Sequence, residues 1–314
     1  MPCRFAALTR ASFMLCSFLT AAITALPATA GERQQLGYGR LVTNDLIGDG
    51  RDRWRTGSVA SSRVWGPKWT GALPETFGRL LELRLNFEAI APEQLNAPAA
   101  GDRPYAGAIS VGLHSHHQIA GTEFALGGDL VFTGPQTGID DFQDFMHDYL
   151  GGEDINSRTR NAQIGDDINP TAVAEIGRPI RLGQSARLRP FVEMRAGVET
   201  LARVGADLSF GRIGQGELLL RDPVTGHRYR SIRSSGAGMG FVFGGDIAYV
   251  DHSEYLPSNQ GYQLTDSRTR LRTGLHVQTE AGHRFFYGLT WLGKEFEAQR
   301  EEQLVGSVRI NLEF

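Results

Sequence analysis

An acidic segment between residues 44 and 57 (NDLIGDGRDRWRTG) contains oxygen ligands suited to a metal ion. It holds the carboxylates of Asp45, Asp49 and Asp52, together with the side-chain amide of Asn44. Carboxylate and amide oxygens are ligands that a hard cation such as Ca²⁺ prefers. However, no acid closes a twelve-residue EF-hand loop here, and an ordinary acidic surface turn has a similar composition. The spacing alone leaves a calcium site and a surface turn as alternatives.

Residues 101–107 (GDRPYAG) combine a cation and an aromatic ring at the start of an expected strand. The guanidinium of Arg103 could hold a phosphate through two parallel hydrogen bonds, and Tyr105 could lie at a membrane interface. The alternative interpretation is a strand that begins after Pro104 and carries an interfacial aromatic residue.

Residues 139–152 predict a short amphipathic helix ended by glycines. Its apolar side would consist of Ile139, Phe142, Met146, Tyr149 and Leu150. His147 lies beside that side, with Asp144 one turn earlier and Asp148 next to it, so it could act as a general base supported by a carboxylate. A histidine in such a helix can equally be a packing or solvent-facing residue.

Alternating strands are the elements that must position these segments. Residues 303–314 place Val308 and Ile310 on one face and Ser307 and Arg309 on the other, and they end on an aromatic residue. This pattern is typical of the closing strand of an outer-membrane barrel, with lipid on one side and a polar lumen on the other. An amphipathic edge strand of a soluble sandwich would look similar.

The same alternation predicts an all-β fold, a transmembrane antiparallel β-barrel of about twelve strands with a short helix in an extracellular loop. Residues 212–235 could add a hairpin, which would raise the number of strands to fourteen. The expected strands are 35–44, 54–64, 79–89, 105–117, 122–132, 171–181, 187–198, 201–211, 236–249, 270–280, 283–293 and 303–314.

The order of the strands predicts where the candidate residues meet. If both termini are periplasmic, the connections 45–53, 90–104 and 133–170 all open on the extracellular side. The acidic segment, Arg103 and His147 would then share one rim. His114, His116 and His117 would lie at the other end.

The N-terminal residues predict a signal peptide over 1–30, cleaved after Ala30, with residues 31–314 forming the barrel domain. Both cysteines lie in the segment to be removed. Cleavage would lower the number of Lys and Arg residues from 32 to 30 against 35 acidic residues, a net charge of −5. This charge argues against a nucleic-acid partner. No GxSxG motif supports serine hydrolysis.

Taken together, the signal peptide and four motifs resemble the outer-membrane lipid A deacylase family, the lipid A 3′-O-deacylases. The motifs are residues 44–45 (ND), residues 52–57 (DRWRTG), residues 102–107 (DRPYAG) and residues 134–135 (GP) leading to His147. The resemblance covers nearly the whole expected mature chain, and DRPYAG is its most specific part.

The resemblance implies a twelve-stranded barrel in the bacterial outer membrane that removes the 3′-linked acyloxyacyl chain of lipid A (lipopolysaccharide), with a bound Ca²⁺. Separately from the resemblance, we expect the barrel to be monomeric. Its site would face the extracellular leaflet. Asn44, Asp45 and Asp52 would be metal ligands, and the first two would also orient the reacting carbonyl. His147 would activate water, with Glu153 as its acidic partner.

Three further residues would bind substrate on this resemblance. Arg103 would face the phosphorylated glucosamine, beside Tyr105, and Thr70 is a weaker match to a hydroxyl site residue. The family's Trp after the histidine helix is absent, although Gln163 remains. A non-catalytic barrel that acts as a pore or surface-binding protein is therefore an alternative. A phospholipase would need a Ser partner for His147, and we find none.

Overall fold

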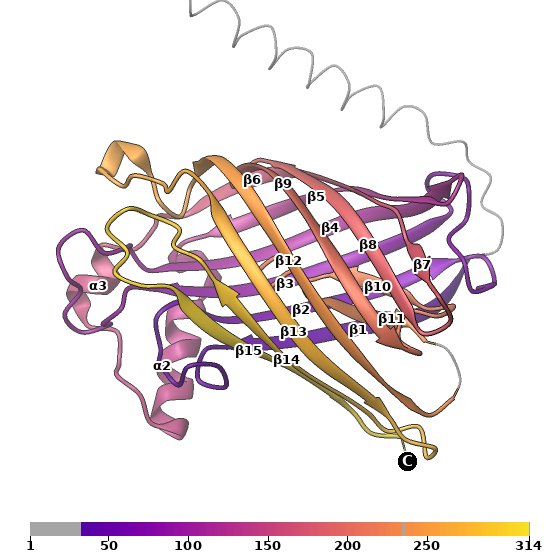
Figure 1. The fold of residues 1–314 in the computed structure, drawn as a ribbon. Coiled ribbons are helices and arrows are strands. Elements are labelled where there is room, and N and C mark those ends of the chain that lie inside the picture. The colour runs from indigo at the N-terminus through magenta and orange to yellow at the C-terminus, as the bar shows by residue number, and fades with distance from the viewer. Residues whose placement is uncertain (1–32, 234–235, 314) are drawn as a thin grey trace, which may run out of the picture. The chain divides into compact units, whose positions relative to one another are not determined.

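Twelve antiparallel strands form a closed barrel in the computed structural model, which describes residues 33–233 and 236–313 (Figure 1). The predicted all-β barrel and its twelve strands are confirmed. The signal peptide predicted at 1–30 lies outside the described residues. The wall strands are β1 (Gln34–Asn44), β2 (Trp54–Gly66), β3 (Leu80–Ala91), β4 (Ala106–Ile119), β5 (Thr122–Thr133), β6 (Asp167–Gly177), β8 (Ala186–Ala196), β9 (Glu199–Gly211), β12 (Gly238–Ser253), β13 (Arg268–Gln278), β14 (Arg284–Leu292) and β15 (Gln303–Asn311).

The first and last wall strands close the barrel. Val42, Thr43 and Asn44 of β1 pair with Val308, Ser307 and Gly306 of β15. Each wall strand also pairs with the wall strands before and after it in the chain, so β6 pairs with β8, and β9 pairs with β12. Closure leaves no open sheet edge for pairing with other chains.

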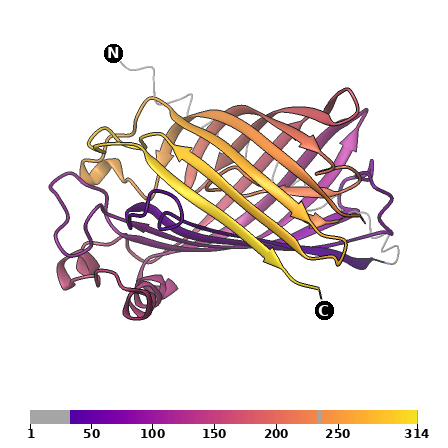
Figure 2. The same ribbon diagram turned by 60° about the horizontal axis from the view of Figure 1, so that its bottom comes forward.

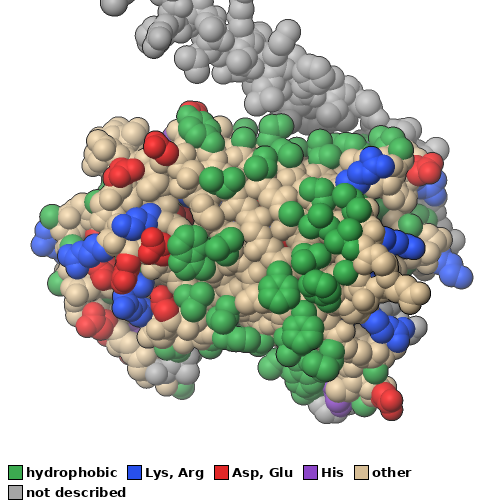
Figure 3. Space-filling model, viewed as in Figure 1, with side chains coloured by type: hydrophobic (Ala, Val, Ile, Leu, Met, Phe, Trp, Pro, Cys, Tyr) green, Lys and Arg blue, Asp and Glu red, His purple; other side chains and the backbone are tan. Residues whose placement is uncertain are grey.

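Side-chain alternation separates a polar lumen from an apolar outer face, as the sequence pattern predicts. In β3, Glu82 and Glu88 are buried inside, whereas Phe87 is exposed outside. Exposed aliphatic and aromatic side chains gather over the middle of the wall in the space-filling view (Figure 3). This outer surface suits acyl chains.

The sixth strand begins earlier than expected. The sequence predicts 171–181, but β6 spans Asp167–Gly177, and the short β7 (Ile180–Leu182) follows it beside β8. Pro170 is tolerated within β6 because its pairing with β8 starts only at Ala172. At Pro170 the strand therefore has a neighbour on one side only, and the missing N–H costs no ladder hydrogen bond.

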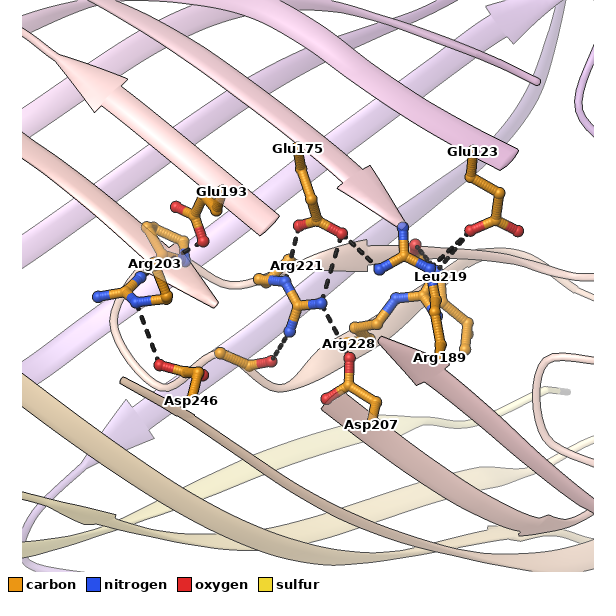
Figure 4. Close-up of polar contacts among 12 residues, drawn as sticks. Glu123, Glu175, Arg189, Glu193, Arg203, Asp207, Leu219, Arg221, Arg228 and Asp246 are labelled. Atoms are coloured by element: carbon orange, nitrogen blue, oxygen red, sulfur yellow. Dashed lines mark hydrogen bonds and ion pairs between the residues drawn. The ribbon is translucent and has the colours of Figure 1, made fainter. Parts of the chain in front are cut away.

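The described part of residues 212–235, which ends at residue 233, adds no strand to the wall. It contains a separate hairpin of β10 (Leu218–Arg221) and β11 (Arg228–Ile232). Its side chains pack against inward-facing wall residues in one buried apolar cluster, and Arg221 pairs with Glu175 of β6 and Asp207 of β9 (Figure 4). The cluster comprises Leu41, Ala60, Val64, Leu80, Leu218, Leu220, Tyr229, Ile232 and Phe286. The hairpin therefore fills part of the lumen.

The two barrel ends differ in their connections (Figure 2). The end that we call the long-loop end carries residues 45–53, 92–105 and 134–166, together with the helices η1 (Pro135–Thr137), α2 (Ile139–Leu150) and α3 (Ser157–Asn161), and also η2 (Ser258–Gln260). The opposite, terminal end carries Gln34 and Asn311. The three predicted segments therefore do share one rim. Among the described residues, no helix is both long and apolar enough to span a membrane.

Candidate active site

Helix α2 packs against the outer surface of the barrel wall. In β4, Ala108 and Ser110 line the lumen, so strand alternation turns Gly107 outward with the exposed Val111 and Leu113. A Cβ atom added to Gly107 would lie 2.5 Å from Thr137 Oγ1 and 2.8 Å from Ile139 Cβ. Glycine at this position therefore allows the start of α2 to approach the wall closely.

The polar side of α2 faces the protein. Asp140 and Gln143 are buried, whereas Phe142, Phe145 and Tyr149 are more than half exposed. Of the apolar side predicted for this helix, Ile139 is buried. The helix therefore presents carboxylate, amide and imidazole groups to the rim.

Two acceptors hold the imidazole of His147. Its Nδ1 lies 2.8 Å from the main-chain oxygen of Glu153, and its Nε2 lies 2.8 Å from Asp52 Oδ2. A carbonyl oxygen only accepts, so Nδ1 carries a proton and Nε2 is the atom that can exchange one. The structure does not bring the Glu153 carboxylate to His147 as predicted, because the main-chain oxygen of Glu153 makes the contact and the carboxylate comes from Asp52.

Asp144 does not support His147 either. Its Oδ1 accepts the N–H of Ile155, and its other oxygen pairs with Arg160 of α3. Arg160 also pairs with Asp140 at 2.6 Å. These contacts fix α2 against α3, which explains the acids of this helix without a catalytic role.

A hydroxyl joins the two carboxylates of the acidic segment. Thr56 Oγ1 lies 3.0 Å from Asp45 Oδ1 and also contacts Asp52 Oδ1. Asp45 is 1 % exposed, and its Oδ2 accepts the Arg53 N–H at 2.8 Å. Burial, and then the nearby Asp52 carboxylate, raise the pKa of Asp45 to about 8, against the opposing effect of the Arg53 N–H. No cationic side chain among the described residues forms an ion pair with this carboxylate.

The metal prediction fits part of its residue set. Asp45, Asp52 and the Thr56 hydroxyl supply hard oxygen donors that suit Ca²⁺. Asn44 does not point with them, because Asp45 and Thr43 are buried on the other face of the chain and Asn44 Oδ1 accepts the Leu46 N–H at 2.8 Å. Within the described ranges, no three acidic or histidine side chains gather closely enough to hold a metal ion.

Asn44 instead lies in an outward-facing row of small residues that crosses five strands at the rim. The register pairs Gly306, Asn44, Gly57, Ala89 and Gly107 in that order. The main chain of Ile47 covers Gly306 at one end of this row, and Ile139 of α2 covers Gly107 at the other. Between these two ends the outer surface of the wall has little side-chain volume, and the side-chain amide of Asn44 is its polar group.

The sequence suggests that Tyr105 lies at a membrane interface, but in the structure it lies beneath α2. It is 0 % exposed, and its hydroxyl donates to Gln143 Oε1 at 2.9 Å. Gln143 Nε2 in turn donates to the Asp52 carboxylate at 3.3 Å. Tyr105 therefore positions the acid that contacts His147.

Arg103 is buried in the barrel mouth, and Thr70 lies outside the site. Arg103 is 1 % exposed and donates to Glu295 Oε2 at 2.6 Å, and burial lowers its pKa despite that neighbour. A phosphate ligand is expected on the rim surface, but the guanidinium of Arg103 does not lie there. Thr70 lies in the connection between β2 and β3 at the terminal end, so the structure does not bring it near His147.

Two residues of the site were not singled out from the sequence. Thr56 stands in the DRWRTG motif without a predicted role of its own, and it links the two carboxylates. Gln143 is one helical turn before His147 on the same side of α2, and this spacing could have indicated it.

The model of the family described as "Outer membrane protein LpxR" matches residues 13–314. Among solved structures, LpxR from Salmonella typhimurium is similar at 18 % identity and a TM-score of 0.72, over 87 % of this chain and 98 % of that one. The NanC porin matches at 7 % identity and a TM-score of 0.40, over 88 % and 100 % of the two chains. A search among curated proteins finds no match.

Proposed function

Because the chain belongs to the LpxR family of outer-membrane proteins, the lipid A deacylases, we propose that it is a lipid A 3′-O-deacylase. It hydrolyses the ester of the 3′-linked acyloxyacyl chain in the outer leaflet, and the long-loop end faces the cell exterior. The observation that carries this proposal is the imidazole of His147, held between a carbonyl oxygen and a carboxylate at the lipid-facing rim.

The rim supports binding of an acyl ester. The outward row of small residues leaves room for a chain against the wall, beside α2. Since Asn44 Oδ1 is taken by the Leu46 N–H, its Nδ2 is the free group, 3.4 Å from where a Cβ of Gly57 would lie. This arrangement supports a role for Asn44 Nδ2 as the donor to the ester carbonyl oxygen, where charge develops in the transition state.

His147 supplies the proton transfers. In the neutral ring, which carries its single proton on Nδ1, Nε2 takes a proton from a water molecule while the water oxygen bonds to the ester carbon. The same proton then passes to the departing sugar oxygen as the C–O bond breaks, which yields the fatty acid and the free hydroxyl. Asp52 stabilises the imidazolium between these transfers, and Tyr105 and Gln143 hold Asp52 in place.

Asp45 and Asp52 would hold Ca²⁺, with the Thr56 hydroxyl between them. When bound, the ion supplies Lewis-acid stabilisation of negative charge on the reacting oxygen. It would also offset the charge of the buried Asp45 carboxylate.

The alternative, a non-catalytic pore, has less support. The β10–β11 hairpin and its apolar cluster occupy the lumen that solutes would have to cross. A surface-binding role is the remaining alternative, and it would make no use of a tautomer-specific histidine.

Mass spectrometry of lipid A tests the proposal. Cells that express the protein should contain lipid A lighter by the 3′-linked acyloxyacyl chain. A His147→Gln variant that is still folded in the membrane should lower the rate of this loss by about 10² or more. Unchanged lipid A in cells that carry the folded parental protein and Ca²⁺ would contradict the proposal.

A further inference from the structure

A polar cavity lies inside the barrel at the terminal end, away from His147. It has a volume of about 250 Å³ and lies between the wall, the β2–β3 connection and the β10–β11 hairpin. Seven arginine and four glutamate side chains line it. The cavity therefore carries an excess of positive charge.

Four of the seven arginines are paired within the wall and the hairpin. Arg84, Arg189, Arg195 and Arg221 each have a carboxylate oxygen at 2.6–2.8 Å. Figure 4 shows how Glu175 is shared between Arg189 and Arg221. These pairs satisfy the inner part of the cavity, so the excess charge resides on the other three arginines.

Arg181, Arg187 and Arg228 lack a close carboxylate. Arg187 donates to the main-chain oxygens of Gly214 and Ile213, both at 2.7 Å. Arg181 has no ion pair within the part of the chain that the structure describes. Arg228 reaches Glu123 Oε2 at only 3.7 Å, and Arg189 holds that same oxygen at 2.7 Å. Three guanidinium groups thus face one cavity, and among the described residues none of them has a carboxylate oxygen closer than 3.7 Å in an ion pair.

The pairing of β7 with β8 makes this excess more costly. Arg181 and Arg187 are directly opposite each other across the two strands. Like charges in that position destabilise a sheet. An anion held between them would remove the repulsion and would supply acceptors for two planar donor groups.

We propose that this cavity binds a phosphate group, with Arg181 and Arg187 as its principal ligands and Arg228 as a third. A phosphate monoester carries close to two negative charges near neutral pH, so it balances three guanidiniums better than a single carboxylate does. The group comes either from a free phosphate compound or from the headgroup of a phospholipid at this end of the barrel.

Isothermal titration calorimetry on the full chain in detergent micelles, at constant ionic strength, measures binding to this site. One arm uses inorganic phosphate, and the other uses bicelles that contain phosphatidic acid, whose headgroup is a phosphate monoester. Saturable binding of inorganic phosphate identifies a free phosphate ligand, and saturable binding of the bicelles alone identifies a headgroup. Absence of saturable binding in both arms would overturn the proposal, whatever the variants do.

The Arg181→Gln and Arg187→Gln variants should each weaken binding roughly tenfold or more, because each removes a charge-assisted hydrogen bond. Arg178→Gln is the matched control, since Arg178 lies in the same connection but does not line the cavity. Equal loss in the control would show only a general charge effect and would also overturn the site. The rate of deacylation is a separate readout, which these variants should leave unchanged because His147 lies at the other barrel end.

Discussion

The two ring nitrogens of His147 face different acceptors, and this difference determines its chemistry. The Glu153 carbonyl oxygen keeps a proton on Nδ1, which leaves Nε2 to exchange protons next to Asp52. The same acidic segment provides Asp45, whose buried carboxylate forms no ion pair with any described residue. At the scale of single residues, His147 Nε2 is the atom suited to accept a proton. The Asp45 carboxylate is the group that a bound cation would stabilise.

Removal of calcium should abolish deacylation. We expect an excess of chelator to stop the loss of the 3′ chain, and Ca²⁺ to restore it better than Mg²⁺, since a flexible set of oxygen ligands suits the larger ion. Asp45→Ala should mimic chelation, whereas Asp141→Ala should not, because Asp141 is 82 % exposed on α2. The measurement is mass spectrometry of lipid A after incubation with the purified protein. Full activity in excess chelator would remove Ca²⁺ from the mechanism.

Thr56→Val should lower the rate of deacylation roughly tenfold or more, because hydrogen bonds to charged groups contribute about 1.5–3 kcal/mol. Valine keeps the shape of the side chain but removes the donor that lies between Asp45 and Asp52. Thr56→Ser retains the hydroxyl and should recover most of the rate. If Val and Ser variants fold and react equally, the hydroxyl does not position the carboxylates.

Close contact between α2 and the wall brings the histidine to the acidic segment at the scale of elements. Gly107 allows that contact, and Arg160 of α3 holds Asp140 and Asp144 on the helix. Phe142, Phe145 and Tyr149 consequently point away from the protein. An amphipathic helix need not bury its apolar side when ion pairs and hydrogen-bonded polar side chains occupy the other side.

Gly107→Val should displace α2 and reduce activity while the barrel stays closed. The added side chain would overlap Thr137 Oγ1 and Ile139, which lie 2.5 and 2.8 Å from the new Cβ. Gly128→Ala in β5 is the control, because its added Cβ would meet its nearest atom at an ordinary 3.6 Å. Deacylation and heat-resistant mobility in gels should be measured together. Parental activity in Gly107→Val would show that close packing of α2 against the wall is not needed for deacylation.

Closure of the wall and filling of the lumen are properties of the whole molecule. β1 and β15 join the ends of the sheet, and the β10–β11 hairpin occupies the interior with both apolar and ionic contacts. The outer face is left apolar. This combination suits a membrane protein that works at its surface and does not conduct solutes.

The protein should therefore form no steady ion-conducting channel in planar bilayers, although it should migrate as a compact band in mild detergent before heating. Replacement of residues 216–232 with a short Gly-Ser linker should open a conducting path if the barrel still forms. Conductance by the parental protein comparable to that of an open porin would contradict the filled lumen and would revive the pore as a function.

The sequence by itself determined the wall, because a strand period of two places alternate residues on lipid and lumen faces regardless of distant contacts. Strand order likewise determined that residues 44–57, Arg103 and His147 share one end of the barrel. Only the tertiary structure decided which atoms meet there. The choice of Asp52 over Glu153 as the partner of His147, and the burial of Tyr105 and Arg103, depend on how α2 packs against Gly107. The position of the hairpin inside the lumen was decided in the same way, since four-residue and five-residue strands look alike in sequence whether they extend a wall or fill it.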